Sequence, residues 1–257
     1  MMTTHAASSS GVLAILQARM SSSRLPGKVL KPILGKAMLA LQLERLQRVQ
    51  SIDHIIVATS DGPEDDVIAD QCASLSIACY QGDLNNVLHR FYRAAKQYKS
   101  HECQLQHIVR LTGDCPLISP SIIDNVIEQH VRSDAVYTSN CYPATLPDGL
   151  DMEIFTWEAL KQAEEEATSD FDREHVTPYI RNVLAEGRQG YYVHEPDLSA
   201  LRWTVDYPDD FVLVSKIFSS LYPENPKFEL ADILDFLAEH PELKQINSHH
   251  ILKGTTE

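Results

Sequence analysis

The sequence predicts an α/β protein built around a mainly parallel sheet. Short apolar segments alternate with helical segments through the first half of the 257-residue chain. The apolar segments 11–18, 54–60 and 105–114 end in polar residues, as expected for parallel strands that are covered on both faces. This alternation is typical of βαβ units, so we expect a Rossmann-like three-layer α/β/α architecture with one mixed sheet.

Helix signals separate these strands in order. In the range 36–50, apolar residues recur every three to four positions and therefore lie on one helical face. Pro63 and the acidic residues after it start a second helix, since both favour a helix N-terminus. A short strand at 77–81 precedes a helix around residues 88–95, and Ser119 caps a helix that ends near Val131.

The second half has a mixed pattern. The expected strands are 134–139, 151–155, 190–194 and 201–205. The expected helices are near 157–167, 172–186, 209–221 and 229–240. The absence of a Pro/Gly/Ser-rich linker predicts a single domain, which has a nucleotide-binding half, an acceptor-binding half and two tails. These units are 11–245 for the domain, 11–133 and 134–245 for its halves, and 1–10 and 246–257 for the tails.

Composition excludes several classes of function. The chain has 22 Lys plus Arg against 36 Asp plus Glu, a formal net charge of −14, which argues against a nucleic-acid or anionic-membrane surface. No apolar run reaches the roughly 18–20 residues of a membrane helix, and the first ten residues do not resemble a secretion signal. Five cysteines without CxxC pairs suit free thiols in a reducing cytoplasm.

A local basic segment stands out against this acidic background. Residues 17–32 read QARMSSSRLPGKVLKP, and no Asp or Glu occurs from Met1 to Leu43. A turn after a strand presents backbone N–H groups, serine hydroxyls add donors, and Arg24 and Lys28 can neutralise phosphate oxygens. The segment therefore predicts a triphosphate cradle, and a solvated basic loop is the alternative. It matches neither GxxxxGK[ST] nor GxGxxG.

Two carboxylates follow predicted strands at the same edge of the sheet. Asp114 lies in RLTGDCPLI and Asp206 in LRWTVDYPDDF. Mg²⁺ takes one or two carboxylates together with substrate phosphate oxygens, so both residues are candidate metal ligands. The alternative is that they form turns or helix caps, a role that suits Asp209 and Asp210 better.

Other charged residues in the second half are candidates for binding a second substrate. Asp151 and Glu153 lie two apart on a predicted strand and so share a face. Arg173, His175, Arg181 and Arg202 could each bind a carboxylate or phosphate of the acceptor. Each of these residues could equally form a structural ion pair or belong to a solvated face.

Several segments together resemble one family. LAILQARMSSSRLPGKVLKPILGKAML, DLNNVLHRFYRAAK, VRLTGDCPLISPSIID, PDGLDMEIF, REHVTPYI and LRWTVDYPDDF occur in this order between residues 11 and 240. They resemble the cytidylyltransferases that make CMP-activated sugars, and most closely the branch called spore coat polysaccharide biosynthesis protein F. The resemblance implies a glycosyltransferase-A-like nucleotidyltransferase fold, CTP and Mg²⁺ as cosubstrate and cofactor, and a homodimer.

The resemblance also implies roles for particular residues. Phosphate contacts fall to Arg19, Ser22, Arg24 and Lys28. The wider nucleotide site adds Gln17, Ala18, Arg90 and Arg110, although Arg90 follows His89 where this branch usually has an acidic residue. The metal ligands would be Asp114 and Asp206, and the catalytic residues Lys28, Arg24 and Asp114. The residues expected at the acceptor come from the charge pattern above and not from the resemblance: Asp151, Glu153, Arg173, His175 and Arg202.

The implied reaction is attack by an acceptor oxygen on the α-phosphorus of CTP with release of pyrophosphate. The expected acceptor is an anionic sugar or a similar small molecule used in surface polysaccharide synthesis. One alternative is a glycosyltransferase that uses a nucleotide-sugar donor. Such enzymes usually have an Asp-x-Asp metal pair, whereas this chain has TGDCP. The other alternative is a nucleotide-sensing protein without catalysis.

Overall fold

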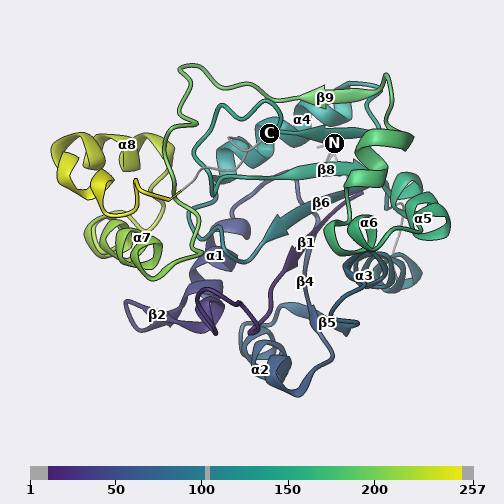
Figure 1. Ribbon diagram of the computed structural model, residues 1–257, viewed down its shortest axis with the longest axis horizontal. Helices are drawn as coiled ribbons and strands as arrows, with labels where there is room; N and C mark the ends of the chain where they lie inside the picture. Colours follow the sequence, from purple (N-terminus) through teal and green to yellow (C-terminus); the bar gives the residue numbers. More distant parts are fainter. Residues whose placement is uncertain (1–10, 102–104, 251–257) are drawn as a thin grey trace, which may run out of the picture.

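The computed structural model describes residues 11–101 and 105–250, and its centre is a seven-stranded sheet with the order β5-β4-β1-β6-β8-β7-β9 (Figure 1). The strands are β1 (Val12–Gln17), β4 (His54–Ser60), β5 (Ala78–Gly82), β6 (His107–Thr112), β7 (Tyr137–Ser139), β8 (Glu153–Thr156) and β9 (Gln189–Tyr191). Only β8 runs antiparallel to its neighbours within this sheet. A separate hairpin pairs β2 (Pro32–Ile33) with β3 (Lys36–Ala37). The predicted mainly parallel mixed sheet is confirmed.

Helices cover both faces of the sheet and complete the three layers. They are α1 (Met38–Leu46), α2 (Asp66–Ser74), α3 (Val87–His101), α4 (Pro120–Arg132), α5 (Trp157–Glu166), α6 (Asp170–His175), α7 (Pro208–Leu221) and α8 (Leu230–Glu239). One hydrophobic cluster joins the sheet to α1, α2, α4, α7 and α8, and a second joins it to α3 and α5. No helix within the described ranges has the length and apolar character needed to cross a membrane.

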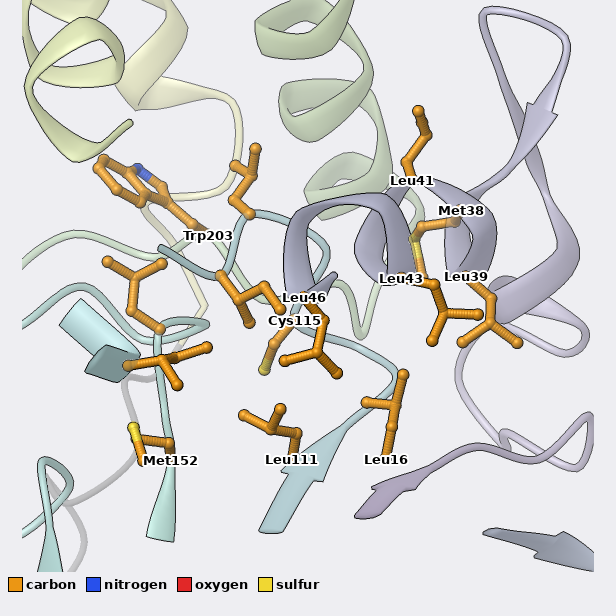
Figure 2. Close-up of a cluster of buried hydrophobic side chains, with 14 of the residues drawn as sticks. Leu16, Met38, Leu39, Leu41, Leu43, Leu46, Leu111, Cys115, Met152 and Trp203 are labelled. Atoms are coloured by element: carbon orange, nitrogen blue, oxygen red, sulfur yellow. The ribbon is translucent and has the colours of Figure 1, made fainter. Parts of the chain in front are cut away.

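Strand β1 supplies both clusters, because successive side chains of a strand point to opposite faces. Leu16 belongs to the first cluster and Ile15 to the second. Helix α1 presents Leu43 and Leu46 toward Leu16 and toward Leu111 of β6 (Figure 2). Each of these four leucines is at most 1% exposed. This packing fixes the end of β1, where the basic segment begins.

The expected strand 201–205 is wrong. The structure pairs this segment through one isolated bridge, between Arg202 and Asp148. Its backbone forms hydrogen bonds with two turns and not with a neighbouring strand. Trp203 N donates to Asp148 O at 2.6 Å, and Val205 N donates to Asp114 O at 2.8 Å. Residues 202–206 are all buried, because the segment crosses between two turns and does not form a strand of the sheet.

The expected helix 172–186 is interrupted. Helix α6 ends at His175, and a π-helix, η3 (Ile180–Leu184), follows. Pro178 disfavours helical backbone at Thr177 and lacks an N–H group. Val176 takes a φ of 68°, a conformation that β-branched residues rarely adopt.

Residues 246–250 belong to the segment expected to be a C-terminal tail, and they pack beside the start of α7. Asn247 is 3% exposed and donates hydrogen bonds to Arg202 O at 3.0 Å and Asp210 Oδ1 at 2.8 Å. The other tail residues of that prediction, 1–10 and 251–257, lie outside the described ranges.

A pair of histidines, one buried and one half-buried, links α4 to the sheet. His130 is 1% exposed, with its Nδ1 2.8 Å from Thr138 Oγ1 and its Nε2 3.1 Å from His107 Nδ1. Burial lowers the pKa of His130 from 6.5 to about 3, and electrostatic repulsion from the nearby His107 makes a smaller contribution in the same direction. Burial also lowers the pKa of His107. Both rings are therefore neutral at neutral pH.

This pair predicts a loss of stability in acid. The unfolded chain binds a proton at His130 near its ordinary pKa, whereas the folded chain does so only near 3, so stability falls as the pH drops from 6.5 toward 3. His130→Gln should reduce this slope by about 1.4 kcal/mol per pH unit, the value for one proton. Urea unfolding across this range measures it. The matched variant His240→Gln should keep the wild-type slope, and an unchanged slope in His130→Gln would contradict the prediction.

Candidate active site

The basic segment follows β1 at the carboxyl-terminal edge of the sheet, where open α/β sheets hold their ligands. A buried carboxylate fixes its start: Asp65 accepts hydrogen bonds from Met20 N at 2.6 Å and from Ser60 N, at the end of β4, at 3.1 Å. Gly27 N returns to Met20 O at 2.9 Å, and Gly27 has a φ of 67° that glycine adopts without a steric penalty. The segment therefore folds back on itself and carries Lys28 inward.

Lys28 lies between the two carboxylates expected to bind metal. It is 8% exposed, and its Nζ donates to Val205 O at 2.7 Å, Asp206 Oδ1 at 2.9 Å and Asp114 Oδ2 at 3.3 Å. An ammonium group has three N–H donors, so these contacts use all of them. The structure thus confirms that Asp114 and Asp206 converge, and it shows a positive charge between them.

Arg24 borders this centre on the solvent side. Its Nη1 donates to Tyr207 Oη at 3.2 Å and lies 3.8 Å from Asp206 Oδ2, while half of the side chain, 51%, is exposed. The hydrogen bond with Tyr207 and the negative charge of Asp206 raise the pKa of Arg24. Burial opposes this shift but is outweighed. Its remaining exposed N–H donors suit a phosphate.

A buried arginine holds Asp206 in place. Arg202 binds Asp210 through two hydrogen bonds, Nε–Oδ1 at 3.0 Å and Nη2–Oδ2 at 2.9 Å, and binds Asp148 Oδ2 at 2.8 Å and Asp206 Oδ2 at 3.4 Å. Asp210 in turn accepts hydrogen bonds from the backbone of Asp206 and Tyr207. Burial opposes ionisation of Asp210, but the bonds from Arg202 and Asn247 outweigh it and lower its pKa. The expected capping role of Asp210 is confirmed.

Gly149 lets the loop before β8 approach the crossing segment closely. Asp148 O accepts Trp203 N at 2.6 Å and Thr204 N at 2.8 Å. Gly149 has a φ of 112°, and a Cβ placed there would lie 2.3 Å from Thr204 N. A side chain at this position would push the crossing segment away from Asp114.

Two further cations expected to bind the nucleotide, Arg19 and Arg90, are close enough for their charges to interact. Arg90 is 2% exposed and donates to Asp83 O at 2.7 Å. Burial, and then the positive charge of Arg19, lower its pKa to about 10. The two guanidinium groups repel each other, and an anion between them would relieve that repulsion. Close by, Ser22 Oγ accepts from Leu25 N at 3.4 Å and braces the loop.

A cavity of about 930 Å³ lies beside this centre, and its lining includes Asp148 and Thr112, the last residue of β6. The cavity lining also contains several residues expected from the sequence: Arg110, Asp151, Glu153, His175 and Arg181. Arg110, expected at the nucleotide, therefore lies at this cavity and forms an ion pair with Glu153. Tyr137 Oη also donates to Glu153, at 2.6 Å.

Two residues expected at the acceptor do not line this cavity. Arg202 belongs to the buried ion-pair group described above, with a side chain that is 5% exposed. Arg173 instead forms an ion pair with Glu164 on α5, with Nη1 3.9 Å from Oε2. Sequence reasoning missed the roles of Asp65 and Asn247, because a buried polar residue whose partners are distant in sequence gives no periodic signal. Asp148 lies within the PDGLD motif, which offered a signal for it.

The residues around Lys28 Nζ fit a hard divalent cation. The surrounding atoms are two carboxylate oxygens and one carbonyl oxygen, which are the donors that Mg²⁺ prefers. The same oxygens already hold one positive charge. Asp114 and Asp206 are thus chemically suited to bind a magnesium ion with the help of substrate phosphates.

Fold and site together define a nucleotide-binding transferase, with cations on the loop after the first strand and two carboxylates at the same edge. The family model for cytidylyltransferases matches residues 13–246, so the chain belongs to the cytidylyltransferase family. Enzymes of this class transfer the CMP group of CTP. The glycosyltransferase alternative receives no support.

Relatives are found among both sequences and solved structures. The chain is 35% identical to an uncharacterized protein of Methanocaldococcus jannaschii, covering 93% of this chain and 95% of that protein. It is 29% identical to the spore coat polysaccharide biosynthesis protein SpsF of Bacillus subtilis, covering 90% and 95%. A cytidylyltransferase structure from Leptospira borgpetersenii superposes with a TM-score of 0.84 at 29% identity, covering 91% and 97%. A CMP:2-keto-3-deoxy-manno-octonic acid synthetase in complex with CTP shares the fold, with a TM-score of 0.57 at 16% identity, covering 81% and 98%.

The ion-pair group predicts a structural role for Arg202. Arg202→Leu should lower the free energy of unfolding by about 3–5 kcal/mol, because it leaves buried carboxylates without their partner. Urea denaturation measures this loss. Arg173→Leu, at a more exposed ion pair, should cost less than about 1 kcal/mol. Wild-type stability of Arg202→Leu together with a raised KM for the acceptor would instead support acceptor binding.

Proposed function

We propose that this cytidylyltransferase transfers CMP from CTP to an anionic sugar or a similar small acceptor, with Mg²⁺ as cofactor, in surface polysaccharide synthesis. The observation that carries the proposal is the position of Asp114 and Asp206 between the basic loop and the cavity. Asp148 lines the cavity and shares Arg202 with Asp206, so the two halves of the site meet there. The name of the Bacillus subtilis relative supports the polysaccharide assignment.

The cavity suits a polar acceptor with a negative group. Arg110 and Glu153 neutralise each other within it. Arg181 stacks over Tyr142, with Cζ 4.4 Å from the ring centroid, and in the described part of the chain no carboxylate lies within ion-pair distance of it. Arg181 therefore offers an unneutralised charge for a carboxylate or phosphate, while Thr177 and other polar lining groups can bind hydroxyls.

The reaction forms a bond between an acceptor oxygen and the α-phosphorus of CTP and breaks the bond to the β-phosphate, which leaves as pyrophosphate. Arg24 and Lys28 offset the negative charge that develops on the phosphoryl oxygens. Arg19 and Arg90 add positive potential on the nucleotide side. A bound Mg²⁺ would supply Lewis-acid stabilisation of the α-phosphate from Asp114 and Asp206. The basic loop and the cavity hold the two reactants in line, which removes much of the entropic cost.

Lys28→Ala and Asp114→Ala should each lower the rate of pyrophosphate release by at least about 100-fold, because each removes a charge from the transition state. The assay combines CTP, Mg²⁺ and a panel of acidic sugars. Circular dichroism checks that both variants remain folded. Wild-type rates in both folded variants would show that the site is wrong, and equal turnover of all four nucleotides would rule out CTP as the preferred substrate.

Metal removal should abolish turnover, and added Mg²⁺ should restore it. Asp206→Asn keeps the hydrogen-bonding shape but loses a negative ligand, so its Mg²⁺ requirement should rise by about 10-fold or more. A titration of rate against Mg²⁺ concentration measures the shift. Asp235→Asn, at an exposed aspartate of α8 that does not contact Lys28, serves as the matched control. Full activity in the presence of EDTA would contradict the proposal.

The proposal extends to the organisation of the enzyme. Residues 11–133 would hold the nucleotide and residues 134–245 the acceptor, in a homodimer that works in the cytoplasm. The position of Arg110 at the cavity gives the nucleotide half a residue at the acceptor as well. Light scattering of the purified chain measures its oligomeric state.

A further inference from the structure

A cluster of two histidines and one aspartate lies at the start of α7, separate from the residues that surround Lys28. His249 Nε2 is 3.0 Å from Asp209 Oδ2, and His250 Nε2 is 2.8 Å from Asp209 Oδ1. One ligand atom from each residue lies within 4.8 Å of the others. Consecutive histidines thus direct the same ring nitrogen toward the two oxygens of one carboxylate.

We propose that Asp209, His249 and His250 bind a divalent transition-metal ion of the zinc type. Imidazole nitrogen with carboxylate oxygen is a donor set that suits zinc, whereas magnesium prefers oxygen alone. Zinc bonds of about 2.0–2.1 Å place tetrahedral ligand atoms about 3.3 Å apart. The observed nitrogen–oxygen separations of 2.8 and 3.0 Å are shorter than this value and involve different oxygens of Asp209, so the rings and the carboxylate would have to shift to admit the ion.

The three residues also have the right accessibility and charge. The His249 side chain is 63% exposed, which gives an ion a route from solvent, while the His250 side chain is only 16% exposed and is held in position. Burial opposes ionisation of Asp209, but the hydrogen bond with His250 and further contacts lower its pKa. Asp209 is therefore an anionic ligand. Water would complete the coordination, as in zinc sites with three protein ligands.

The bound ion would also act on the catalytic turn. The His250 ring stacks on Tyr207 with a centroid distance of 3.9 Å and an angle of 9°. Tyr207 follows Asp206 directly and accepts a hydrogen bond from Arg24. Zinc would thus fasten residues 249–250 over the turn that carries Asp206 without using any ligand assigned to magnesium.

The test uses the full-length, tag-free chain with Zn²⁺ in calorimetric titrations and Co²⁺ as a spectroscopic probe. Wild type should bind one ion through nitrogen ligands, with a visible Co²⁺ absorption and a Tm raised by several degrees. His250→Phe keeps an aromatic ring on Tyr207 but removes the ligand, and it should lower the zinc affinity at least 10- to 100-fold. His249→Ala should do the same. The control His240→Ala, at another exposed histidine, should keep the wild-type affinity.

Two results would overturn the proposal. One is wild-type zinc affinity in both His250→Phe and His249→Ala. The other is a wild-type chain that binds no zinc at micromolar concentrations. If zinc binds at Asp114 and Asp206 instead, both histidine variants would keep the wild-type zinc affinity, and the Co²⁺ spectrum would be typical of oxygen ligands. That result would also contradict the proposed site. His249 is mostly exposed, so its variant remains informative if another variant fails to fold.

Discussion

The ion pairs around Lys28 hold together three parts of the chain that are far apart in sequence. The ammonium group comes from the loop after β1, Asp114 from the end of β6, and Asp206 from the turn before α7. Without the central cation, two carboxylates at this edge would repel each other in a partly buried setting. The same requirement explains Arg202, which neutralises the next layer of carboxylates. Positive and negative side chains therefore alternate through the site: Arg202 positions Asp206, and Asp206 together with Asp114 positions Lys28.

This alternation also suggests how a nucleotide changes the site. In the structure, Lys28 satisfies the carboxylates that a divalent cation would satisfy equally well. Under the proposed function, an ion held by those oxygens would free the ammonium group for a phosphate, so metal and triphosphate would favour each other's binding. Burial of the carboxylates strengthens this coupling, because the interactions between charges weaken less there than in water.

Much of the fold could be predicted from the sequence, because apolar segments and helix caps are local signals. The order of strands and helices up to α4 follows from them, and so does the convergence of Lys28, Asp114 and Asp206 at one edge. Other features depend on contacts distant in sequence. The pattern of residues 201–205 predicts a strand, and nothing local shows that its backbone forms hydrogen bonds with two turns instead. The role of Asn247 depends on where the chain returns after α8.

The contact at Gly149 has a consequence for redesign of the enzyme. The loop that contains this residue also lines the cavity, so it is an obvious place to change the acceptor preference. The same loop holds the segment that leads to Asp206 through a position where no side chain fits. A library of variants that changes this loop freely would disturb the position of Asp206 and the shape of the cavity at the same time. Variation confined to residues 141–146, with Gly149 retained, would separate the two.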